Sequence, residues 1–207
     1  DVIFVMNESF FDVTRLPNVE YGVDPLPNFH RLGEDNTSGT FISNTCNGGT
    51  GYVELEVMTG LCSNLLNEGD TLPYLRPGSV YERIPSVAHV FKENGYHLTF
   101  MHAHTDELYN RPAVYKRLGF DELYFRDSFP KDAEIRGDYI SDRAFADKVI
   151  ELYEARDPEQ PFMMMSVTME NHQPSYEGKF EPDADIPFEA PTLDAAGRAI
   201  FRSYLTG

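Results

Sequence analysis

The chain of 207 residues is long enough to form one domain with a sizeable hydrophobic core. Its 17 lysine and arginine residues against 34 aspartate and glutamate residues give a formal net charge of −17, which argues against nucleic-acid binding because that binding depends on cations that neutralise phosphates. A hydrophobic content of 41% excludes a disordered acidic chain, and no apolar run reaches the roughly 20 residues that a membrane-spanning helix needs.

Apolar periodicity predicts strands and helices that alternate along the chain. In chain order we expect a strand at 2–6, a short helix at 26–35, a strand at 39–44, a helix from about Gly51 to Gly60, a loop at 63–83, a helix at 85–95, a strand at 96–102, a short helix at 111–119, a helix at 141–156, a strand at 161–169 and a final helix at 191–205. Ser86 lies near the start of one helix, and Ser141 is expected to cap another. This alternation predicts an α/β sandwich with a mostly parallel central sheet flanked by helices.

Residue types suited to binding an anion and a metal follow the predicted strands. In open α/β sheets, sites form at the carboxyl ends of the strands. The residues that follow these ends are Glu8, Thr50, His102, His104 and His172. If the strands are parallel, all of these side chains emerge at one edge of the sheet. The sequence therefore predicts an anion and metal site at that edge.

Thr50 is the candidate nucleophile, because it stands in GGTG, residues 48–51, at the start of a predicted helix. Backbone N–H groups at a helix N-terminus favour an anion, and the glycines let the backbone approach a phosphate closely. A threonine hydroxyl needs a metal or a base to act as a nucleophile, and Glu8 could hold that metal. His102 and His172 could bind phosphate oxygens or protonate a leaving group.

Each of these residues also has an ordinary structural explanation. A glycine-rich turn with an N-cap threonine is common without catalysis, and a glutamate such as Glu8 is often simply solvated in a loop. We assign His30, His89 and His97 to structural positions. Several strand ends that each present a suitable group form a stronger pattern than any single residue.

Four segments carry a resemblance to a known family: NESF at 7–10, GGTG at 48–51, HAHTDELYNRPAVYKRLGF at 102–120 and TMENHQP at 168–174. In this order they resemble the lipoteichoic acid synthase family of phosphoglycerol transferases, which belongs to the alkaline phosphatase and sulfatase superfamily. The resemblance runs along nearly the whole chain, and it implies an alkaline phosphatase-like sandwich fold.

The resemblance also implies roles for individual residues. Glu8 matches the family's metal-binding glutamate, and Thr50 matches its nucleophile, which also contacts the metal. The residues at positions of substrate contact are His102, Arg111, His172, Tyr109, His104 and Gly49. The planar, permanently charged guanidinium of Arg111 suits phosphate oxygens. A surface salt bridge for Arg111 and core packing for Tyr109 are the ordinary alternatives.

Metal, substrates and location follow from the same resemblance. The metal would be Mn²⁺ or Mg²⁺, with Zn²⁺ as a further candidate. The substrates would be a glycerophospholipid head group and a polymer or glycan acceptor, with transfer through a phospho-threonine intermediate at Thr50. The intact protein is expected at the extracytoplasmic face of the cell membrane, anchored by segments absent from this chain, while the chain itself is expected to be soluble.

The sequence departs from the family at one point. The family completes its metal site with an Asp-His pair further downstream, and no Asp-His dipeptide occurs in these 207 residues. The chain begins in a predicted core strand and ends in a predicted helix, so we expect residues 1–207 to be a partial catalytic domain whose C-terminal part is missing. A metal held only by Glu8 and Thr50 would lack ligands. We therefore expect weak or no metal binding by this chain, and no activity as it stands.

Other assignments stay open from the sequence. A phosphoethanolamine transferase or a phosphatase of the same superfamily would share this pattern. A non-catalytic domain that binds anionic glycans or lipids, or a structural fold with a decayed site, is also compatible. The segments that begin at Cys46 and Cys62 lack the C/S-x-P-x-R motif of formylglycine sulfatases, which disfavours sulfate hydrolysis. These two cysteines could form a disulfide or remain as buried thiols.

Overall fold

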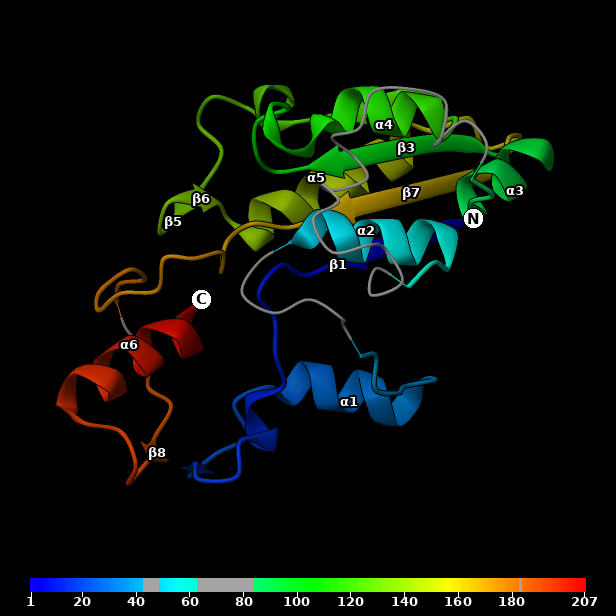
Figure 1. Cartoon of the computed structure of the whole chain (residues 1–207). Helices are drawn as coiled ribbons and strands as arrows, with labels where there is room; N and C mark the ends of the chain where they lie inside the picture. The colour runs from blue at the N-terminus through cyan, green and yellow to red at the C-terminus, as the bar shows by residue number, and fades with distance from the viewer. Residues whose placement is uncertain (43–48, 63–83, 183) are drawn as a thin grey trace, which may run out of the picture.

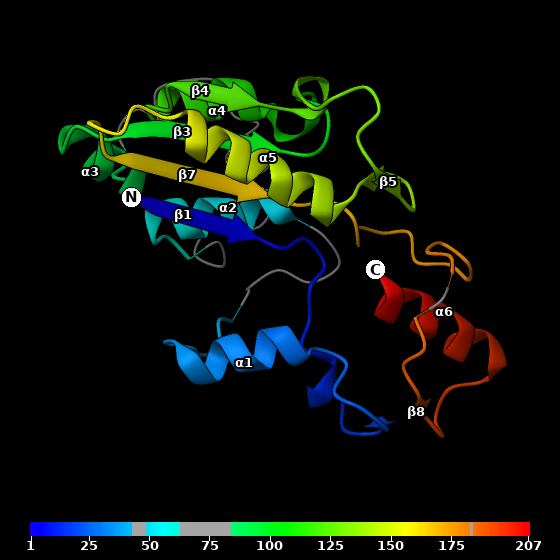
Figure 2. The ribbon, with the colours of Figure 1, turned by 180° about the vertical axis from the view of Figure 1, so that it is seen from behind.

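The structure is a computed structural model that describes residues 1–42, 49–62, 84–182 and 184–207. At its centre lies a four-stranded sheet of order β1-β7-β3-β4, formed by β1 (Val2–Met6), β3 (His97–His102), β4 (Glu122–Tyr124) and β7 (Phe162–Val167). Every neighbouring pair in this sheet is parallel. The predicted α/β fold is therefore confirmed, and the carboxyl ends of β1, β3 and β7 point to the same side of the molecule (Figures 1 and 2).

The register of the sheet brings three strand ends together. Val167 of β7 pairs with Met6 of β1 on one side and with His102 of β3 on the other. β7 is buried along its whole length, and its sequence FMMMSV is the continuous run that a parallel strand covered on both faces requires.

Helices cover both faces of the sheet. The main helices are α2 (Thr50–Thr59), α3 (Val87–Glu93) and α4 (Arg111–Arg117) on one face and α5 (Asp142–Ala155) on the other (Figures 1 and 2). Phe100 of β3 packs in the core on the α2 side, whereas the next residue, Met101, packs against Phe145 in the core on the α5 side. Successive β3 residues thus face the two cores in turn, as the twofold period of a strand dictates.

The helix boundaries follow signals in the sequence. Ser86 Oγ accepts a hydrogen bond of 3.2 Å from the backbone of His89, and Ser141 Oγ accepts one of 3.0 Å from the backbone of Ala144, so both serines are N-caps. α2 ends at Gly60, whose φ of +69° is a left-handed conformation that glycine adopts without strain. The predicted helices all form, with ends shifted by at most four residues.

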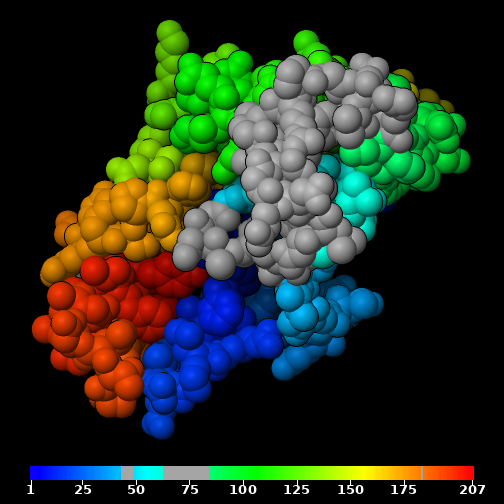
Figure 3. Space-filling view, viewed as in Figure 1, coloured from blue at the N-terminus to red at the C-terminus, as the bar shows by residue number. Residues whose placement is uncertain are grey.

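Segments from both ends of the chain pack together beside the main sheet. The elements here are α1 (Pro27–Asp35), α6 (Ala195–Thr206), and the short strands β2 (Glu20–Tyr21) and β8 (Phe188–Glu189) (Figure 1). β2 and β8 pair antiparallel, and the hydroxyl of Tyr204 donates to the carbonyl of Ser9 at 2.7 Å. Figure 3 shows the blue N-terminal and red C-terminal surfaces side by side.

Smaller elements complete the fold. An antiparallel hairpin of β5 (Ile135–Arg136) and β6 (Tyr139–Ile140) lies near the carboxyl ends of the strands. Short 3-10 turns occur at η1 (Val13–Arg15), η4 (Leu108–Asn110) and η5 (Arg126–Ser128). None of the helices in the described parts of the chain has both the length and the apolar composition that crossing a membrane would take.

The predicted strand at 39–44 is wrong over the residues that the structure describes. Residues 39–42 form no strand, and Phe41 and Ile42 are 71% and 78% exposed. The strand propensity of Phe41 and Ile42 is not enough to form a strand at these residues, because strand propensity depends on packing against neighbouring side chains and both side chains are exposed. Residues 43–44, the predicted loop at 63–83 and Cys46 lie outside the described residues, so the pairing of Cys46 with Cys62 is not tested.

Candidate active site

The predicted nucleophile and the predicted metal ligand are in contact. Thr50 is the first residue of α2, and its hydroxyl donates a hydrogen bond of 2.8 Å to Glu8 Oε2. Gly49 precedes it with a φ of +94°, a left-handed conformation that favours glycine. The hydroxyl of Thr50 therefore lies at the end of α2 whose backbone N–H groups attract an anion.

Glu8 is held at the carboxyl edge of the sheet by residues that continue β7. Its backbone N–H donates to Thr168 Oγ1 at 3.0 Å, and the backbone N–H of Thr168 donates to the carbonyl of Met6 at 3.0 Å. Thr168 is buried, so this connection is protected from water. Sequence analysis did not single out Thr168, although it opens the segment TMENHQP.

His102 ends β3 at the same edge and is 1% exposed. Its Nδ1 lies 3.2 Å from the carbonyl of Val167, the residue that pairs with both His102 and Met6. Burial, reinforced by the positive charge of Arg111, lowers the pKa of His102 to about 3. The neutral ring donates its Nδ1 proton to that carbonyl and keeps Nε2 as an acceptor. His102 is therefore unsuited to protonating a leaving group at neutral pH, one of the two roles that the sequence allowed.

His104 and His172 lie in a row of rings with Tyr139. The ring centroids are 6.0 Å apart for His102 and His104, 5.9 Å for His104 and Tyr139, and 5.6 Å for Tyr139 and His172. Burial lowers the pKa of His104 below its ordinary value, and the charge of His172 adds to that effect. The structure thus gathers the three histidines that follow strands. Tyr139 was not foreseen, because it stands in a hairpin too short for a sequence pattern.

Arg111 is buried rather than part of a surface salt bridge. It begins α4, is 1% exposed, and donates from Nη2 to Glu54 Oε1 at 2.6 Å and from Nε to Glu54 Oε2 at 3.1 Å. The hydroxyl of Tyr115 donates to the same carboxylate at 2.8 Å. Glu54 is fully buried one helical turn beyond Thr50. Arg111 is therefore fixed to the helix that carries the candidate nucleophile. The sequence signal that could have pointed to Glu54 is its place between two apolar residues of α2, where an acidic side chain can be buried and then needs a partner.

Tyr109 approaches the same arginine through an unusual turn. Tyr109 and Asn110 have φ values of +58° and +51°, which residues with side chains adopt rarely and at some cost. The turn places the ring of Tyr109 with its centroid 4.9 Å from the guanidinium carbon of Arg111, a distance at which a cation and an aromatic ring attract. Tyr109 also packs against the core cluster on the α2 side.

The oxygen atoms of Glu8 and Thr50 are the ligand type that Mg²⁺ and Mn²⁺ prefer. Their contact therefore fits one part of a site for such an ion. Over the residues that the structure describes, no three His, Cys, Asp or Glu side chains come close enough together to hold a metal.

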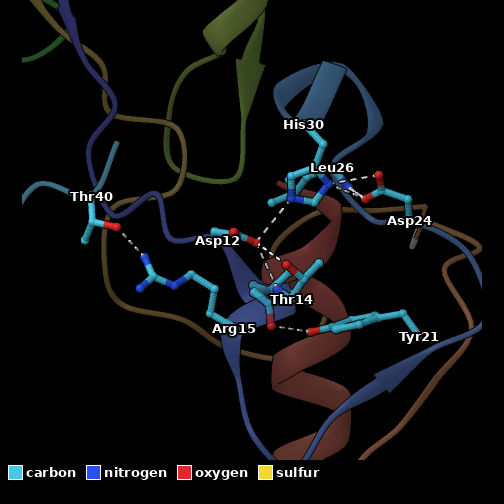
Figure 4. Close-up of polar contacts among 9 residues, drawn as sticks. Asp12, Thr14, Arg15, Tyr21, Asp24, Leu26, His30 and Thr40 are labelled. Atoms are coloured by element: carbon cyan, nitrogen blue, oxygen red, sulfur yellow. Dashed lines mark hydrogen bonds and ion pairs between the residues drawn. The ribbon is translucent and has the colours of Figure 1, made fainter. Parts of the chain in front are cut away.

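The three histidines assigned to structural positions make contacts of that kind. His30 Nδ1 lies 2.9 Å from Asp24, and its Nε2 lies 3.5 Å from Asp12 (Figure 4). The hydrogen bond to Asp24 raises the pKa of His30 above its ordinary value. His30 thereby connects α1 to the 3-10 turn at η1. His89 Nδ1 lies 2.9 Å from the hydroxyl of its own N-cap, Ser86, and His97 lies 3.7 Å from Asp121.

Comparison with known proteins identifies the family. The family model described as Sulfatase matches residues 1–205. The chain belongs to the Sulfatase family. A protein of Rhizobium meliloti (strain 1021), named "Putative cyclic beta-1,2-glucan modification protein", is 34% identical over 207 residues, which are 100% of this chain and 30% of the relative.

Two solved structures share the fold of this Sulfatase-family chain. Phosphoglycerol transferase GacH of Streptococcus pyogenes, in complex with sn-glycerol-1-phosphate, matches with a TM-score of 0.83 and 24% identity, covering 99% of this chain and 52% of GacH. Lipoteichoic acid synthase LtaP of Listeria monocytogenes matches with a TM-score of 0.75 and 24% identity, covering 100% of this chain and 48% of LtaP. The Sulfatase match confirms the superfamily that the resemblance implied, and the folds of GacH and LtaP confirm the fold that it implied. The chain spans about half of each solved protein and less than a third of the Rhizobium relative.

Proposed function

We propose that residues 1–207 form part of the catalytic domain of an enzyme that transfers phosphoglycerol from a glycerophospholipid to a cell-envelope polymer or glycan. The observation that carries this proposal is the 2.8 Å hydrogen bond between Thr50 and Glu8 at the start of α2. This hydrogen bond lies at the edge of the sheet from which His102 and His172 also emerge. The names of GacH and LtaP favour phosphoglycerol as the group transferred, and the name of the Rhizobium relative favours a glycan as its acceptor.

The reaction proceeds by two displacements at phosphorus. In the first, Thr50 Oγ1 forms a bond to the phosphorus of the donor and loses its proton to solvent, while the bond from phosphorus to the diacylglycerol oxygen breaks and that oxygen takes up a proton. In the second, an acceptor hydroxyl loses its proton and forms a bond to the same phosphorus, while the bond from phosphorus to Thr50 Oγ1 breaks and that oxygen takes up a proton. A Mn²⁺ or Mg²⁺ ion, or Zn²⁺ as the alternative, held by Glu8 and Thr50 would favour loss of the Thr50 proton.

Other residues bind and orient the transferred group. Arg111 and the backbone N–H groups at the start of α2, with Gly49 beside them, supply positive potential for the phosphate oxygens. The Nε2 acceptor of neutral His102 suits a hydroxyl donor, such as a glycerol hydroxyl, better than a phosphate oxygen. His104, His172 and Tyr109 contribute further contacts to the same phosphoglycerol group.

The metal site needs more ligands than Glu8 and Thr50, since a catalytic site normally uses about three from the protein. We infer that the remaining ligands, expected as an Asp-His pair, lie outside these 207 residues. The chain alone then binds metal weakly and lacks transferase activity. The intact protein acts at the extracytoplasmic face of the cell membrane, where both donor lipid and glycan are accessible.

The test measures diacylglycerol release by the intact protein from vesicles of phosphatidylglycerol or phosphatidylethanolamine. Thr50→Ala should lower release at least about 10³-fold, because the nucleophile is lost, and Thr50→Ser should restore part of it. Thr59→Ala at the other end of α2 is the matched control, since its hydroxyl makes only backbone contacts in the part of the chain that the structure describes: it donates to the carbonyl of Leu55 at 2.7 Å and accepts from the backbone N–H of Leu61 at 3.2 Å. Undiminished turnover by Thr50→Ala would refute the role of Thr50 as the nucleophile. Turnover of phosphatidylethanolamine alone would show that the transferred group is phosphoethanolamine and not phosphoglycerol.

A further inference from the structure

The hairpin of β5 and β6 makes an ion pair and a hydrogen bond to residues 170–173, the segment that contains His172. Arg136 of β5 forms an ion pair of 3.0 Å with Glu170, and it donates to the carbonyl of Thr206 at 3.1 Å. The hydroxyl of Tyr139 in β6 donates to the carbonyl of Gln173 at 3.3 Å. These contacts involve both strands of the hairpin, so its place relative to residues 170–173 is well defined.

The turn of the hairpin closely approaches the side chains of Lys179 and Phe180, at a position whose backbone conformation favours glycine. Gly137 has a φ of +57°, and a Cβ atom there would come within 2.8 Å of Lys179 Cε and 3.0 Å of Phe180. Lys179 is itself 6% exposed and donates from Nζ to the carbonyl of His172. Its Nζ lies 5.5 Å from the ring centroid of Tyr139, so the same buried lysine contacts the backbone of His172 and the ring of Tyr139.

Tyr139 is thereby placed between two of the candidate substrate-binding histidines. Its ring meets that of His172 edge to face at 76° and 5.6 Å, and it meets that of His104 at 51° and 5.9 Å. Such geometry is favourable for aromatic rings and restricts how each can rotate. The ring of His172 thus has two contacts that restrict it, because its Nδ1 also lies 2.8 Å from the carbonyl of Gln173.

We propose that Tyr139 is a positioning residue, presented by the β5–β6 hairpin so that His104 and His172 keep the orientation in which they contact a phosphoglycerol group. The inference rests on the proposed function for the identity of that ligand. The hydroxyl of Tyr139 contributes one long hydrogen bond, whereas both histidine contacts involve the ring. The ring rather than the hydroxyl therefore carries the role.

The experiment compares Tyr139→Leu with Tyr139→Phe in the intact protein and uses sn-glycerol-1-phosphate as the probe. Tyr139→Leu should weaken binding, measured by calorimetry, about tenfold, since two aromatic pairs are lost. Tyr139→Phe should restore most of the affinity. In NMR spectra the imidazole protons of His172 should shift in Tyr139→Leu, because the ring current of the tyrosine is gone, and stay near their wild-type positions in Tyr139→Phe.

Tyr153→Leu is the matched control, because Tyr153 packs against Phe162 at the opposite end of β7. It should leave both the affinity and the His172 signals unchanged. If Tyr139→Leu does not fold, Gly137→Ala serves instead, since its new methyl group would come within 2.8 Å of Lys179 Cε in a strained backbone conformation, so the hairpin or the lysine contact to His172 must shift. Wild-type affinity and unshifted His172 signals in the folded variant would overturn the inference. Failure of the wild-type protein to bind the probe would instead count against the proposed function, and the NMR comparison would still decide whether Tyr139 orients His172.

Discussion

At the scale of single residues, burial decides whether His102 can carry a proton. His102 is enclosed at the end of β3 beside the cation of Arg111, and its pKa falls to about 3. The same enclosure makes its Nε2 a dependable acceptor. A histidine at this position therefore works as a neutral hydrogen-bonding group and not as an acid.

The depressed pKa of His102 should appear in the pH dependence of stability. The unfolded chain takes up a proton at this residue near pH 6.5, whereas the folded chain does so only near pH 3. Below pH 6.5 the unfolded state therefore binds more protons, and stability falls as the pH falls. Between pH 6.5 and 4.5 the free energy of unfolding should drop about 2–3 kcal/mol more in the wild type than in His102→Gln. Urea denaturation at several pH values measures this difference, and parallel curves for the two proteins would contradict it.

At the scale of elements, α2 joins two parts of the site. It begins with Thr50, and one turn later it presents Glu54 to Arg111 of α4. The ion pair is buried, so each charge offsets part of the cost of removing the other from water. Any movement of α2 would shift the hydroxyl and the guanidinium together.

Removing Glu54 should therefore be costly. Glu54→Ala leaves a buried guanidinium without its carboxylate, and it should lower the free energy of unfolding by about 3–5 kcal/mol. Glu151→Ala is the matched control, because Glu151 is 61% exposed in a surface pair with Lys148 and should cost less than about 1 kcal/mol. Denaturation in urea compares the two variants. Equal, small losses in both would show that the Glu54 pair does not hold α2 to α4.

The elements that sequence predicted well are those with strong local signals. β7 is a continuous apolar run, and α5 has a serine cap followed by regular apolar spacing. The strand expected at 39–44 failed where it is described, because Phe41 and Ile42 have strand-like character but stay exposed. The two-residue strands β5 and β6 carry no periodic signal at all, so Tyr139 could not be placed beside the histidines in advance.

The residues of the candidate site also fall into two groups, those that the sequence predicted and those that only the structure revealed. Glu8, Thr50, His102, His104 and His172 could be expected together because each follows a strand or opens a helix at one edge of a parallel sheet. Glu54 and Thr168 act through contacts between residues far apart in sequence, such as Arg111 with Glu54. A single sequence gives no measure of such contacts, and only the packed structure reveals them.

At the scale of the whole molecule, the fold brings the ends of β1, β3 and β7 and the start of α2 to one edge, although they are far apart in the chain. The chain belongs to the Sulfatase family, and GacH and LtaP share its fold. We expect Thr50 to carry the transferred group during turnover.

Mass spectrometry of the intact protein, quenched in acid during turnover of phosphatidylglycerol, tests that claim most directly. We predict a mass increase equal to one phosphoglycerol group, located by peptide mapping on Thr50 and absent from Thr50→Ala. Rapid quenching matters because the second displacement removes the group. An adduct on a different residue, or an adduct that persists in Thr50→Ala, would contradict the account.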